Sequence, residues 1–457
     1  MAQYAPDSHD TENLSLLRNL KMGSFHIGSA MTDVLVGGVW NRVMIQDLGF
    51  AATPVGLLVS LRFFLAPLAM WAGQRSDHTD WRGYRRLPWV WGGRLSMIFG
   101  YLLLAFSTVE LTRQGSLWWI GIFTGFLIAS LGYSISGSTF LALVYDRAPQ
   151  HQRGRAVGVV WTFLLAGYAI AGVLFARLLP EYSESAFITF FVVVSILLIL
   201  IWTFALWGEE KRHTIDSDTQ KNNHQINTGA HFRDELRELW KNQSTQALAF
   251  FMLLSFCAAF MHETLLEPFG GGVFGLSVGE TSRFQAYWGT MAIVSSALTL
   301  WAYRRFQQYG YQHFARYGVI IMMLTFSLLT VTALSAAESL LRPALVLLGV
   351  GYGLWNIGTL GLMVENSREE KAGFDLGVWT VIVTLSRGGG ILMGAVLFDV
   401  FAFTLGDTAG AYGMVFALEA LLLIAALVVV NQLEATAAVK SVKNDADGEL
   451  ILASSMD

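Results

Sequence analysis

Ionisable side chains occur inside long apolar stretches of this 457-residue chain, where a charge is costly and usually faces a cavity or a partner. The candidates for binding or coupling a cargo are Asp33, Asn41, Arg42, Arg62, Arg94, His262, Glu263, Glu267 and Arg387. Asp33 and Glu263 take matching places in the first and seventh stretches, so we expect them to face one central cavity. Arg62, Arg94 or Arg387 would neutralise them. Such carboxylates either bind cargo or couple its movement to protons, or they form a static ion pair that fixes helix packing.

The apolar stretches themselves predict membrane-spanning helices. Hydrophobic residues make up 54% of the chain, charged residues make up 14%, and the mean hydropathy is +0.49, which is too apolar for an ordinary soluble protein. A helix needs roughly 20 residues to cross the bilayer core, where its backbone must satisfy its own hydrogen bonds. We place twelve spans at 24–45, 55–72, 88–109, 117–144, 157–179, 186–207, 246–268, 284–303, 314–335, 340–364, 374–398 and 412–432.

Basic residues concentrate in every second gap between these spans. With the amino terminus inside, 22 of the 30 Lys and Arg residues fall on one side of the membrane, and the positive-inside rule makes that side, with both termini, cytoplasmic. We therefore expect a cytoplasmic tail at 1–23, a six-helix half at 24–207, a cytoplasmic linker at 208–245, a second six-helix half at 246–432, and a loose, polar cytoplasmic tail at 433–457.

The two halves resemble each other. Gly132 and Tyr133 in the fourth span recur as Gly351 and Tyr352 in the tenth. Two similar six-helix halves joined by a linker are typical of the major facilitator fold, whose cavity lies between the halves near the midplane. The sequence thus predicts an all-α integral membrane protein of that fold, with twelve transmembrane helices in two six-helix halves.

The loop after the second span carries GQRSD at 73–77 and GYRR at 83–86. This pattern resembles the signature that major facilitators have between their second and third helices. There the glycine permits close helix packing, and the aspartate joins a charge network that holds the cytoplasmic side shut in one state. The resemblance implies gating roles for Gly73, Asp77, Arg85 and Arg86. A loop that is merely rich in arginine also satisfies the positive-inside rule.

The seventh span contains residues that interrupt helices. Pro268 lacks a backbone donor, and the three glycines at 270–272 are conformationally permissive. We therefore expect Glu267-Pro268 and these glycines to break or end the helix, with Pro268 forming part of an outer gate.

Longer motifs indicate one particular family among the proteins with the major facilitator fold. They are WNRVMI at 40–45, DLG at 47–49, APL at 66–68, LEPFGG at 266–271, VFG at 273–275, GET at 279–281, RF at 283–284 and AYWG at 286–289. They resemble the PucC/LhaA family, the bacteriochlorophyll delivery group of the major facilitator superfamily. The resemblance implies an assembly factor for photosynthetic light-harvesting complexes in the bacterial inner membrane. Such a factor binds or delivers bacteriochlorophyll or chlorophyll to nascent antenna polypeptides, with pigment-synthesis enzymes as further partners.

The implied cargo is a flat macrocycle with an apolar tail and a magnesium that accepts an axial ligand. Its site needs aromatic walls, and the best candidates are the tryptophans inside spans, which are Trp40, Trp161, Trp288, Trp355 and Trp379. Most other tryptophans stand where interfacial belts are expected. His26 and His262 are the histidines placed to ligate the pigment magnesium, although packing is the commoner role of such a residue. We expect no permanent cofactor and no metal held by the protein itself.

The sequence leaves two hypotheses for the function open, one an assembly factor and the other a transporter. The first is the pigment-handling assembly factor, and the second is a proton-coupled secondary transporter of a small solute that works through Asp33 or Glu263. The chain has no nucleophile elbow, phosphate loop or paired metal-ligand motif, so we do not expect an enzyme. Its basic residues follow one face of the lipid bilayer instead of forming a patch, so we expect no nucleic-acid partner.

Overall fold

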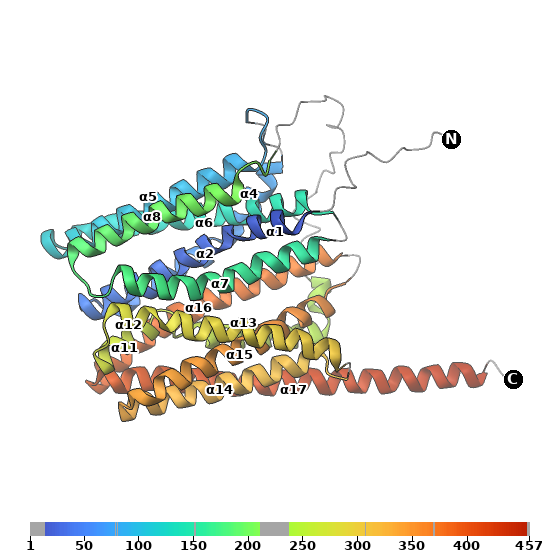
Figure 1. Ribbon diagram of the computed structural model, residues 1–457. Helices are drawn as coiled ribbons and strands as arrows, with labels where there is room; N and C mark the ends of the chain where they lie inside the picture. The colour runs from blue at the N-terminus through green and yellow to red at the C-terminus, as the bar shows by residue number, and fades with distance from the viewer. Residues whose placement is uncertain are drawn as a thin grey trace.

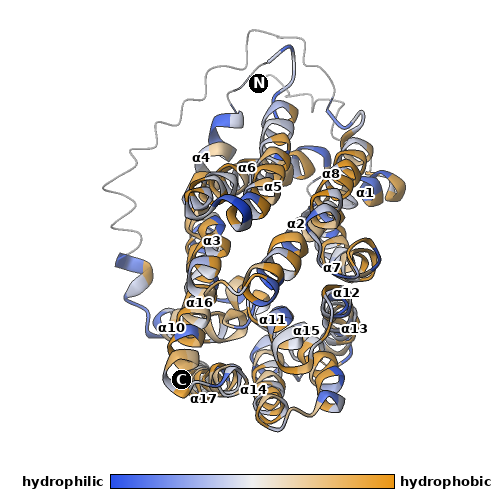
Figure 2. Ribbon diagram, turned by 90° about the vertical axis from the view of Figure 1, so that its left-hand side faces the viewer, coloured by the Kyte–Doolittle hydropathy of each residue, from blue (hydrophilic) through white to orange (hydrophobic). Residues whose placement is uncertain are grey.

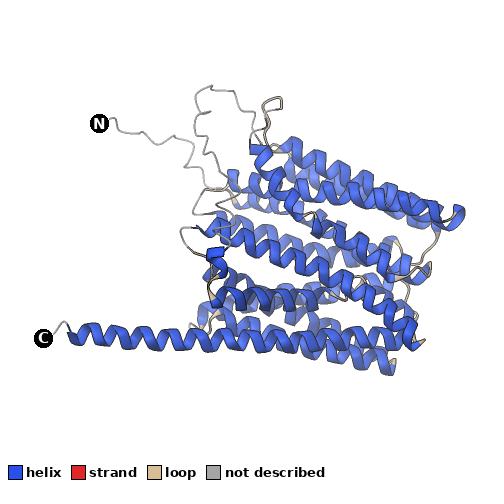
Figure 3. Ribbon diagram, turned by 180° about the vertical axis from the view of Figure 1, so that it is seen from behind, coloured by secondary structure: helices blue, strands red, loops and turns tan. Residues whose placement is uncertain are grey.

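The structure, a computed structural model, describes residues 14–77, 79, 81–149, 152–210, 237–306, 308–368 and 371–454. Long helices run side by side through these residues (Figures 1 and 3). The strand-like pairing among them is a single isolated bridge between Trp81 and Tyr84. Helices satisfy their own backbone groups, as a lipid environment requires, and the all-α prediction is confirmed.

The helices before the predicted linker form one group. In chain order they are α1 (Leu16–Gly23), α2 (Phe25–Val34), the π-helical segments η1 (Leu35–Trp40) and η2 (Val43–Asp47), α3 (Ala52–Phe64), α4 (Ala66–Asp77), α5 (Leu87–Gln114), the short 3-10 helix η3 (Ser116–Trp118), α6 (Trp119–Arg147), α7 (Arg153–Leu178) and α8 (Glu184–Leu206). Local sequence sets their ends. Ser183 caps α8 by accepting a hydrogen bond from the Ala186 N–H, and α5 stops at Gly115, whose φ is 94°.

A second group follows the linker. It consists of α10 (Gln243–Phe260), α11 (Leu266–Phe274), α12 (Val278–Ser282), α13 (Phe284–Arg305), α14 (Tyr311–Ser335), the 3-10 helix η5 (Glu338–Leu340), α15 (Leu341–Glu365), α16 (Ala372–Leu405) and α17 (Thr408–Ser454). Figure 2 looks along the helices and shows this group beside the first, with α16 next to α3 and α13 next to α7. The predicted linker lies outside the described residues from 211 to 236.

Among the described residues, ten helices are long and apolar enough to cross a membrane, and they match ten of the twelve predicted spans. The other two lie in the same bundle (Figure 1). The first predicted span is divided among α2, η1 and η2, and the eighth, α13, carries Gln, Ser, Thr and Tyr among its apolar residues. At the far end, α17 continues as a helix to Ser454, where the sequence predicts a loose tail.

Equivalent packing recurs in the two groups at the repeated glycines. A β carbon at Gly132 would lie 3.0 Å from the Met97 side chain of α5, and one at Gly351 would lie 2.7 Å from the Met322 side chain of α14. Both glycines therefore let their helix approach its neighbour more closely than a larger residue permits. The repeat read from the sequence corresponds to the same kind of contact in the α5–α6 and α14–α15 pairs.

Two spans depart from regular α-helix partway along their length. The first becomes π-helical at η1 and η2, and such turns often occur at functional sites. In the seventh span, α10 ends at Phe260, residues 261–265 form turns, and α11 begins at Leu266. This break precedes the predicted one. Pro268 lies in the first turn of α11, where a missing N–H costs nothing, and α11 ends at Gly275 with a φ of 68°.

Candidate functional site

Four charged side chains from the first, second, seventh and eleventh predicted spans meet between the two groups of helices. Arg62 on α3 forms an ion pair with Asp33 on α2, and its Nη2 lies 3.3 Å from Oε1 of Glu263 in the break of the seventh span. Arg387 on α16 donates from Nε to Oε2 of Glu263 at 3.0 Å and from Nη2 to Oε1 at 2.8 Å. We call Asp33, Arg62, Glu263 and Arg387 the central ion-pair chain.

The central ion-pair chain is electrically balanced, because two arginines offset two carboxylates. The side chains of Asp33 and Arg62 are 7% and 8% exposed, whereas those of Glu263 and Arg387 are 17% and 24% exposed. Pairing removes much of the cost of placing such charges away from water. From the sequence we expect Asp33 and Glu263 to face one central cavity, and in the structure Arg62 contacts both acids.

Aromatic rings cover both arginines of this chain. The guanidinium carbon of Arg387 lies 4.2 Å from the ring centroid of Phe260 and 4.7 Å from that of Phe63. The guanidinium carbon of Arg62 lies 4.6 Å from the same Phe63 ring. Because a cation is attracted to the face of an aromatic ring, these rings stabilise the arginines while keeping the surroundings apolar.

A row of rings continues from the ion-pair chain across both groups. The Tyr168 hydroxyl on α7 donates to Oδ2 of Asp33 at 2.7 Å. The Tyr168 ring lies 5.3 Å from Trp288 on α13, which lies 5.7 Å from Tyr352 on α15, and Tyr352 lies 6.0 Å from Phe260. We call Tyr168, Trp288, Tyr352 and Phe260 the aromatic wall. Sequence reasoning missed Tyr168, since tyrosines are common in spans and give no separate signal.

The tryptophans proposed from the sequence divide into two kinds. Trp288 belongs to the aromatic wall, and Trp161 on α7 is 52% exposed. Three others are core residues, at most 2% exposed: Trp40, Trp355 and Trp379. These three fill space between helices and do not offer an accessible surface to a cargo.

Arg94 stands apart from the central ion-pair chain. It is 1% exposed, its Nη2 donates to Oγ of Ser29 at 3.0 Å, and its guanidinium carbon lies 4.3 Å from the Phe25 ring and 4.7 Å from the Trp202 ring. Within the described residues it makes no ion pair with a carboxylate. His26 is buried beside it, with its ring 5.7 Å from that of Phe25. Both residues pack among rings in this structure.

His262 lies in the break of the seventh span and contacts an acid from the last span. Its Nδ1 is 3.1 Å from Oε1 of Glu419 on α17, and the two residues are 4% and 0% exposed. The His262 ring also packs 5.0 Å from Phe326. His262 is thus hydrogen-bonded and enclosed by neighbouring helices, as in a packing role, and it is not exposed to a cargo. Sequence reasoning missed Glu419, although an acid inside a predicted span was the signal that identified the other candidates.

Asn41 and Arg42 tie the first helix to the segment around α11. Nδ2 of Asn41 donates to the Thr264 carbonyl at 2.9 Å. Arg42 donates from Nη1 to Oδ2 of Asp47 at 2.7 Å and from Nη2 to the Leu276 carbonyl at 3.0 Å. Burial raises the pKa of the Asp47 carboxyl, and the Arg42 charge opposes this effect.

Further bonds join the two groups at this same end, which we call the α11 end. Oδ1 and Oδ2 of Asp399 accept hydrogen bonds from the N–H groups of Ala52 at 2.9 Å and Thr53 at 2.7 Å. The Gly279 N–H donates to the Pro180 carbonyl at 3.0 Å. The structure is therefore closed at the α11 end by bonds between residues that are far apart in sequence.

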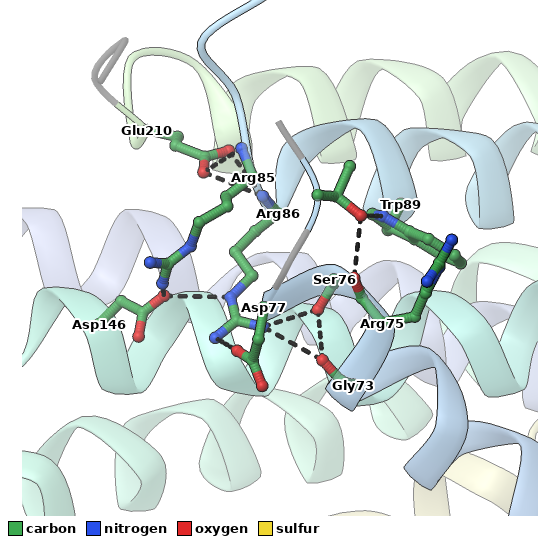
Figure 4. A network of polar contacts seen from close by, with 10 residues as sticks. Gly73, Arg75, Ser76, Asp77, Arg85, Arg86, Trp89, Asp146 and Glu210 are labelled. Atoms are coloured by element: carbon green, nitrogen blue, oxygen red, sulfur yellow. Dashed lines mark hydrogen bonds and ion pairs between the residues drawn. The ribbon is translucent and has the colours of Figure 1, made fainter. Parts of the chain in front are cut away.

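The gating residues proposed in the loop after the second span meet at the opposite end, whereas Pro268 lies in α11 (Figure 4). Arg86 is 5% exposed and forms ion pairs with Asp77 and, through Nε at 3.1 Å, with Asp146. Its Nη1 also donates to Oγ of Ser76 at 2.6 Å and to the Gly73 carbonyl at 3.4 Å. Arg86 thereby connects the ends of α4, α5 and α6.

Glu210 completes this network from the end of α8. Its carboxylate accepts hydrogen bonds from the backbone N–H groups of Arg85 at 2.8 Å and Arg86 at 2.9 Å (Figure 4). It also accepts one from the N–H group of Leu87 at 2.7 Å. A negative charge at the first turn of a helix is stabilising because the N-terminus is positive, and α5 begins here. Nη2 of Arg85 lies 3.2 Å from Oδ2 of Asp146. Among the described residues, the network joins helices of the first group to one another.

A pocket of about 10 Å³ lies beside Arg62. It is lined by Val36, Val59, Arg62, Tyr101, Phe126, Ala129, Ser130 and Tyr133, all from the first group. Its volume is about the space that one water molecule needs, so this pocket is too small for a macrocycle. No group of three His, Cys, Asp or Glu side chains suited to a metal occurs within the described part of the chain.

This fold, with paired charges between two groups of helices, defines a multi-pass membrane protein of the major facilitator transporter architecture. A bacterial homologue of the human lysosomal transporter Spinster, in an inward-facing and unoccupied conformation, matches with a TM-score of 0.63 at 15% identity, over 92% of this chain and 96% of that one. The nucleoside transporter NupG matches with a TM-score of 0.63 at 14% identity, over 92% and 99%. A D-xylose-proton symporter matches with a TM-score of 0.62 at 12% identity, over 89% and 95%.

The chain belongs to the PUCC protein family, whose model matches residues 39–438. It is 28% identical to Protein PucC of Rhodovulum sulfidophilum, over 85% of this chain and 86% of that protein, and 28% identical to Protein PucC of Cereibacter sphaeroides, over 92% of each. It is 27% identical to a Rhodobacter capsulatus protein named "Bacteriochlorophyll synthase 44.5 kDa chain", over 90% and 94%. The family read from the sequence motifs is confirmed, and it is a family of transporter fold and not of enzymes.

Proposed function

We propose that this protein assists the assembly of photosynthetic light-harvesting complexes by binding bacteriochlorophyll or chlorophyll and delivering it to nascent antenna polypeptides. The observation that carries this proposal is the family match over residues 39–438. The name of the Rhodobacter capsulatus relative, which includes bacteriochlorophyll, supports the same cargo.

The geometry between the two groups suits an apolar, flat cargo. The aromatic wall is a row of four rings, and the centroids of successive rings lie 5.3, 5.7 and 6.0 Å apart. The adjacent charges are already paired within the central ion-pair chain, so a neutral macrocycle meets no unbalanced charge there. The pigment would lie against the aromatic wall, with Trp288 and Tyr352 as the principal contacts and Trp161 as a second accessible ring.

We also propose the orientation and setting that the basic loops indicate. Both termini and the linker at 208–245 would be cytoplasmic, and the halves would comprise 24–207 and 246–432. The α11 end would then face the opposite side of a bacterial photosynthetic inner membrane. Antenna polypeptides would bind along a lipid-facing helix surface, and pigment-synthesis enzymes would bind at the cytoplasmic side.

Purification in a mild detergent from pigment-producing cells tests the cargo. We expect red or near-infrared pigment absorption to copurify with the wild type, and Trp288→Leu to reduce bound pigment several-fold. Trp301→Leu is the matched control, because Trp301 on the same helix is 60% exposed and lies outside the aromatic wall. Colourless wild-type protein from such cells would count against the proposal.

Gene deletion tests the assembly role separately. Antenna complexes should fall several-fold while pigment synthesis continues, since the enzymes that make the pigment remain. Normal antenna levels in the deletion strain would contradict the proposal.

A proton-coupled transporter of a small solute is the second candidate, and the central ion-pair chain is the observation that favours it. Acids paired with arginines between two halves can exchange protons with partner charges during transport. Vesicles that contain the purified protein would then take up a solute in response to a proton gradient, and Glu263→Gln would abolish the uptake. Without such uptake, the ion-pair chain is a packing element of the assembly factor.

A further inference from the structure

Glu267 and Gln285 form an enclosed polar pair at the α11 end. Glu267 on α11 is 0% exposed, and Gln285 near the start of α13 is 8% exposed. Nε2 of Gln285 donates to Oε1 of Glu267 at 2.6 Å. The remaining oxygen of each end group, Oε2 of Glu267 and Oε1 of Gln285, is buried and has no hydrogen-bond partner among the described residues.

No described cation neutralises Glu267. The ionisable groups on the neighbouring segments include Arg42, Asp47, Arg177, His262, Glu263, Glu280, Arg283, Tyr287, Tyr412 and Glu419. Arg177 is exposed, and His262 contacts Glu419. Arg42 is bound to Asp47 and to the Leu276 carbonyl, and Arg283 is exposed. Glu263 forms ion pairs with Arg62 and Arg387 of the central ion-pair chain. An ionised carboxylate in this place would be buried without a counter-charge, which is strongly unfavourable.

We propose that Glu267 and Gln285 form a proton-binding site in which Glu267 is held as the neutral acid. A proton on Oε2 of Glu267 makes that oxygen a donor, and the free amide oxygen of Gln285 is an acceptor. An acid and a primary amide that face each other can close a ring of two hydrogen bonds. The N–H to Oε1 bond is already present at 2.6 Å, so a single proton satisfies both unpartnered oxygens.

The site lies where three spans meet. A β carbon at Gly38 in η1 would stand 3.6 Å from both Nε2 of Gln285 and Oε1 of Glu267, so the first span packs directly on the pair. The seventh and eighth spans supply Glu267 and Gln285 themselves. Loss of the proton would leave a bare carboxylate between these spans and would favour opening of this end to water. Proton binding thus stabilises the closed α11 end, whatever the cargo.

Infrared spectroscopy of the purified protein tests the protonation state directly, because a carboxylic acid and a carboxylate absorb at different carbonyl frequencies. At neutral pH we expect a carboxylic-acid band that Glu267→Gln removes and that Glu280→Gln leaves in place. Glu280 is the matched control, since it is an exposed acid on the neighbouring α12. Unchanged carboxylic-acid absorption in Glu267→Gln would overturn the proposal.

Thermal unfolding of the same proteins provides a second readout. Glutamine at 267 can keep both hydrogen bonds to Gln285, so Glu267→Gln should fold and unfold at the wild-type temperature or above it. The wild type should lose stability as the pH is raised from the ordinary glutamate pKa through neutral, because the folded chain holds a proton that the unfolded chain releases. This loss should be reduced in Glu267→Gln. A Glu267→Gln protein that fails to fold would overturn the proposal.

A third measurement separates a proton from a metal cation. Gln285→Leu removes the amide acceptor, so its carboxylic-acid band should shift to higher frequency while Glu267 stays protonated. If the wild type lacks the band and is stabilised by sodium chloride but not by choline chloride, the pair binds a metal ion and the proposal is wrong.

Discussion

Arg387 donates two hydrogen bonds to Glu263, from Nε and from Nη2, while Arg62 approaches the same carboxylate from the other group of helices. Glu263 is therefore an acceptor shared across the two groups. Asp33 supplies the second negative charge through its own ion pair with Arg62. The four side chains are one electrostatic unit, so the loss of one changes the pairing of the others.

Removing Arg387 should destabilise the protein measurably. Breaking a buried ion pair costs roughly 3–5 kcal/mol, and Arg62 remains close to Glu263, so we expect Arg387→Met to cost about 3 kcal/mol in detergent unfolding. The double variant Glu263→Gln with Arg387→Met should recover much of this loss. Arg342→Met, at an exposed position on α15, is the control and should stay within about 0.5 kcal/mol. Equal losses of stability in Arg387→Met and Arg342→Met would contradict a stabilising role for the Arg387–Glu263 pair.

Gly271 must lack a side chain for Arg42 to reach Leu276. A β carbon at Gly271 would overlap the Arg42 guanidinium. We expect Gly271→Ala to displace Arg42 and to cost about 1–3 kcal/mol, as overpacking does. Gly137→Ala on α6 is the control, because nothing lies within 4 Å of its β carbon, and it should be neutral or slightly stabilising. Unfolding temperatures of the two variants compare them, and a neutral Gly271→Ala would refute the close contact.

Glu210 should act as a charged cap for α5. Glu210→Gln keeps a side-chain oxygen but removes the negative charge that faces three backbone N–H groups. We expect a loss of about 0.5–2 kcal/mol in unfolding free energy, together with faster amide exchange at 85–87. Glu181→Gln, at an exposed position, should change neither quantity. If amide exchange at 85–87 is unaffected in Glu210→Gln, the cap is not formed.

A pH-dependent contact joins the segment before α10 to the loop before α16. Oε2 of Glu238 lies 3.2 Å from Nζ of Lys371 and 3.4 Å from Nη1 of Arg368. The hydrogen bond from Lys371 and the two nearby positive charges lower the pKa of Glu238. The contribution of this contact is therefore complete above the ordinary glutamate pKa and is lost as the pH falls through the lowered value. Amide exchange around Arg368 should accelerate in acid in the wild type.

The control for this prediction is Glu238→Gln, in which exchange around Arg368 should already be fast at neutral pH. Because Glu238 is 62% exposed on its side chain, global stability should be unchanged, as for most surface ion pairs. Acid-induced acceleration of the same size in both proteins would assign the effect to another group.

The sequence predicts the spans well because an apolar run of about 20 residues indicates a membrane-spanning helix. It also places Asp33 and Glu263 at matching depths, since they take matching places in two similar halves, but it does not specify that Arg62 contacts both. It could not predict that Trp40, Trp355 and Trp379 are core residues. A span is apolar on its lipid face and on its packed face alike, so no periodicity separates the two.

Other differences arise from tertiary contacts. The break in the seventh span precedes Pro268, because proline is well tolerated in the first turn of a helix and therefore marks where α11 begins. Arg94 bonds to Ser29 and aromatic rings instead of an acid, and Glu419 is the partner of His262. Each of these depends on which helices are neighbours, and sequence spacing does not contain that information.

The break at 261–265 divides the seventh span into two separate helices, α10 and α11. The carbonyl of His262 accepts hydrogen bonds from the N–H groups of both Leu265 and Leu266, so α11 starts anew from this residue and is not a continuation of α10. A tilt of α11 can therefore be taken up at Glu263 without bending α10. The break carries the acid that two arginines share, so a tilt of α11 about Glu263 would act on α3 through Arg62 and on α16 through Arg387.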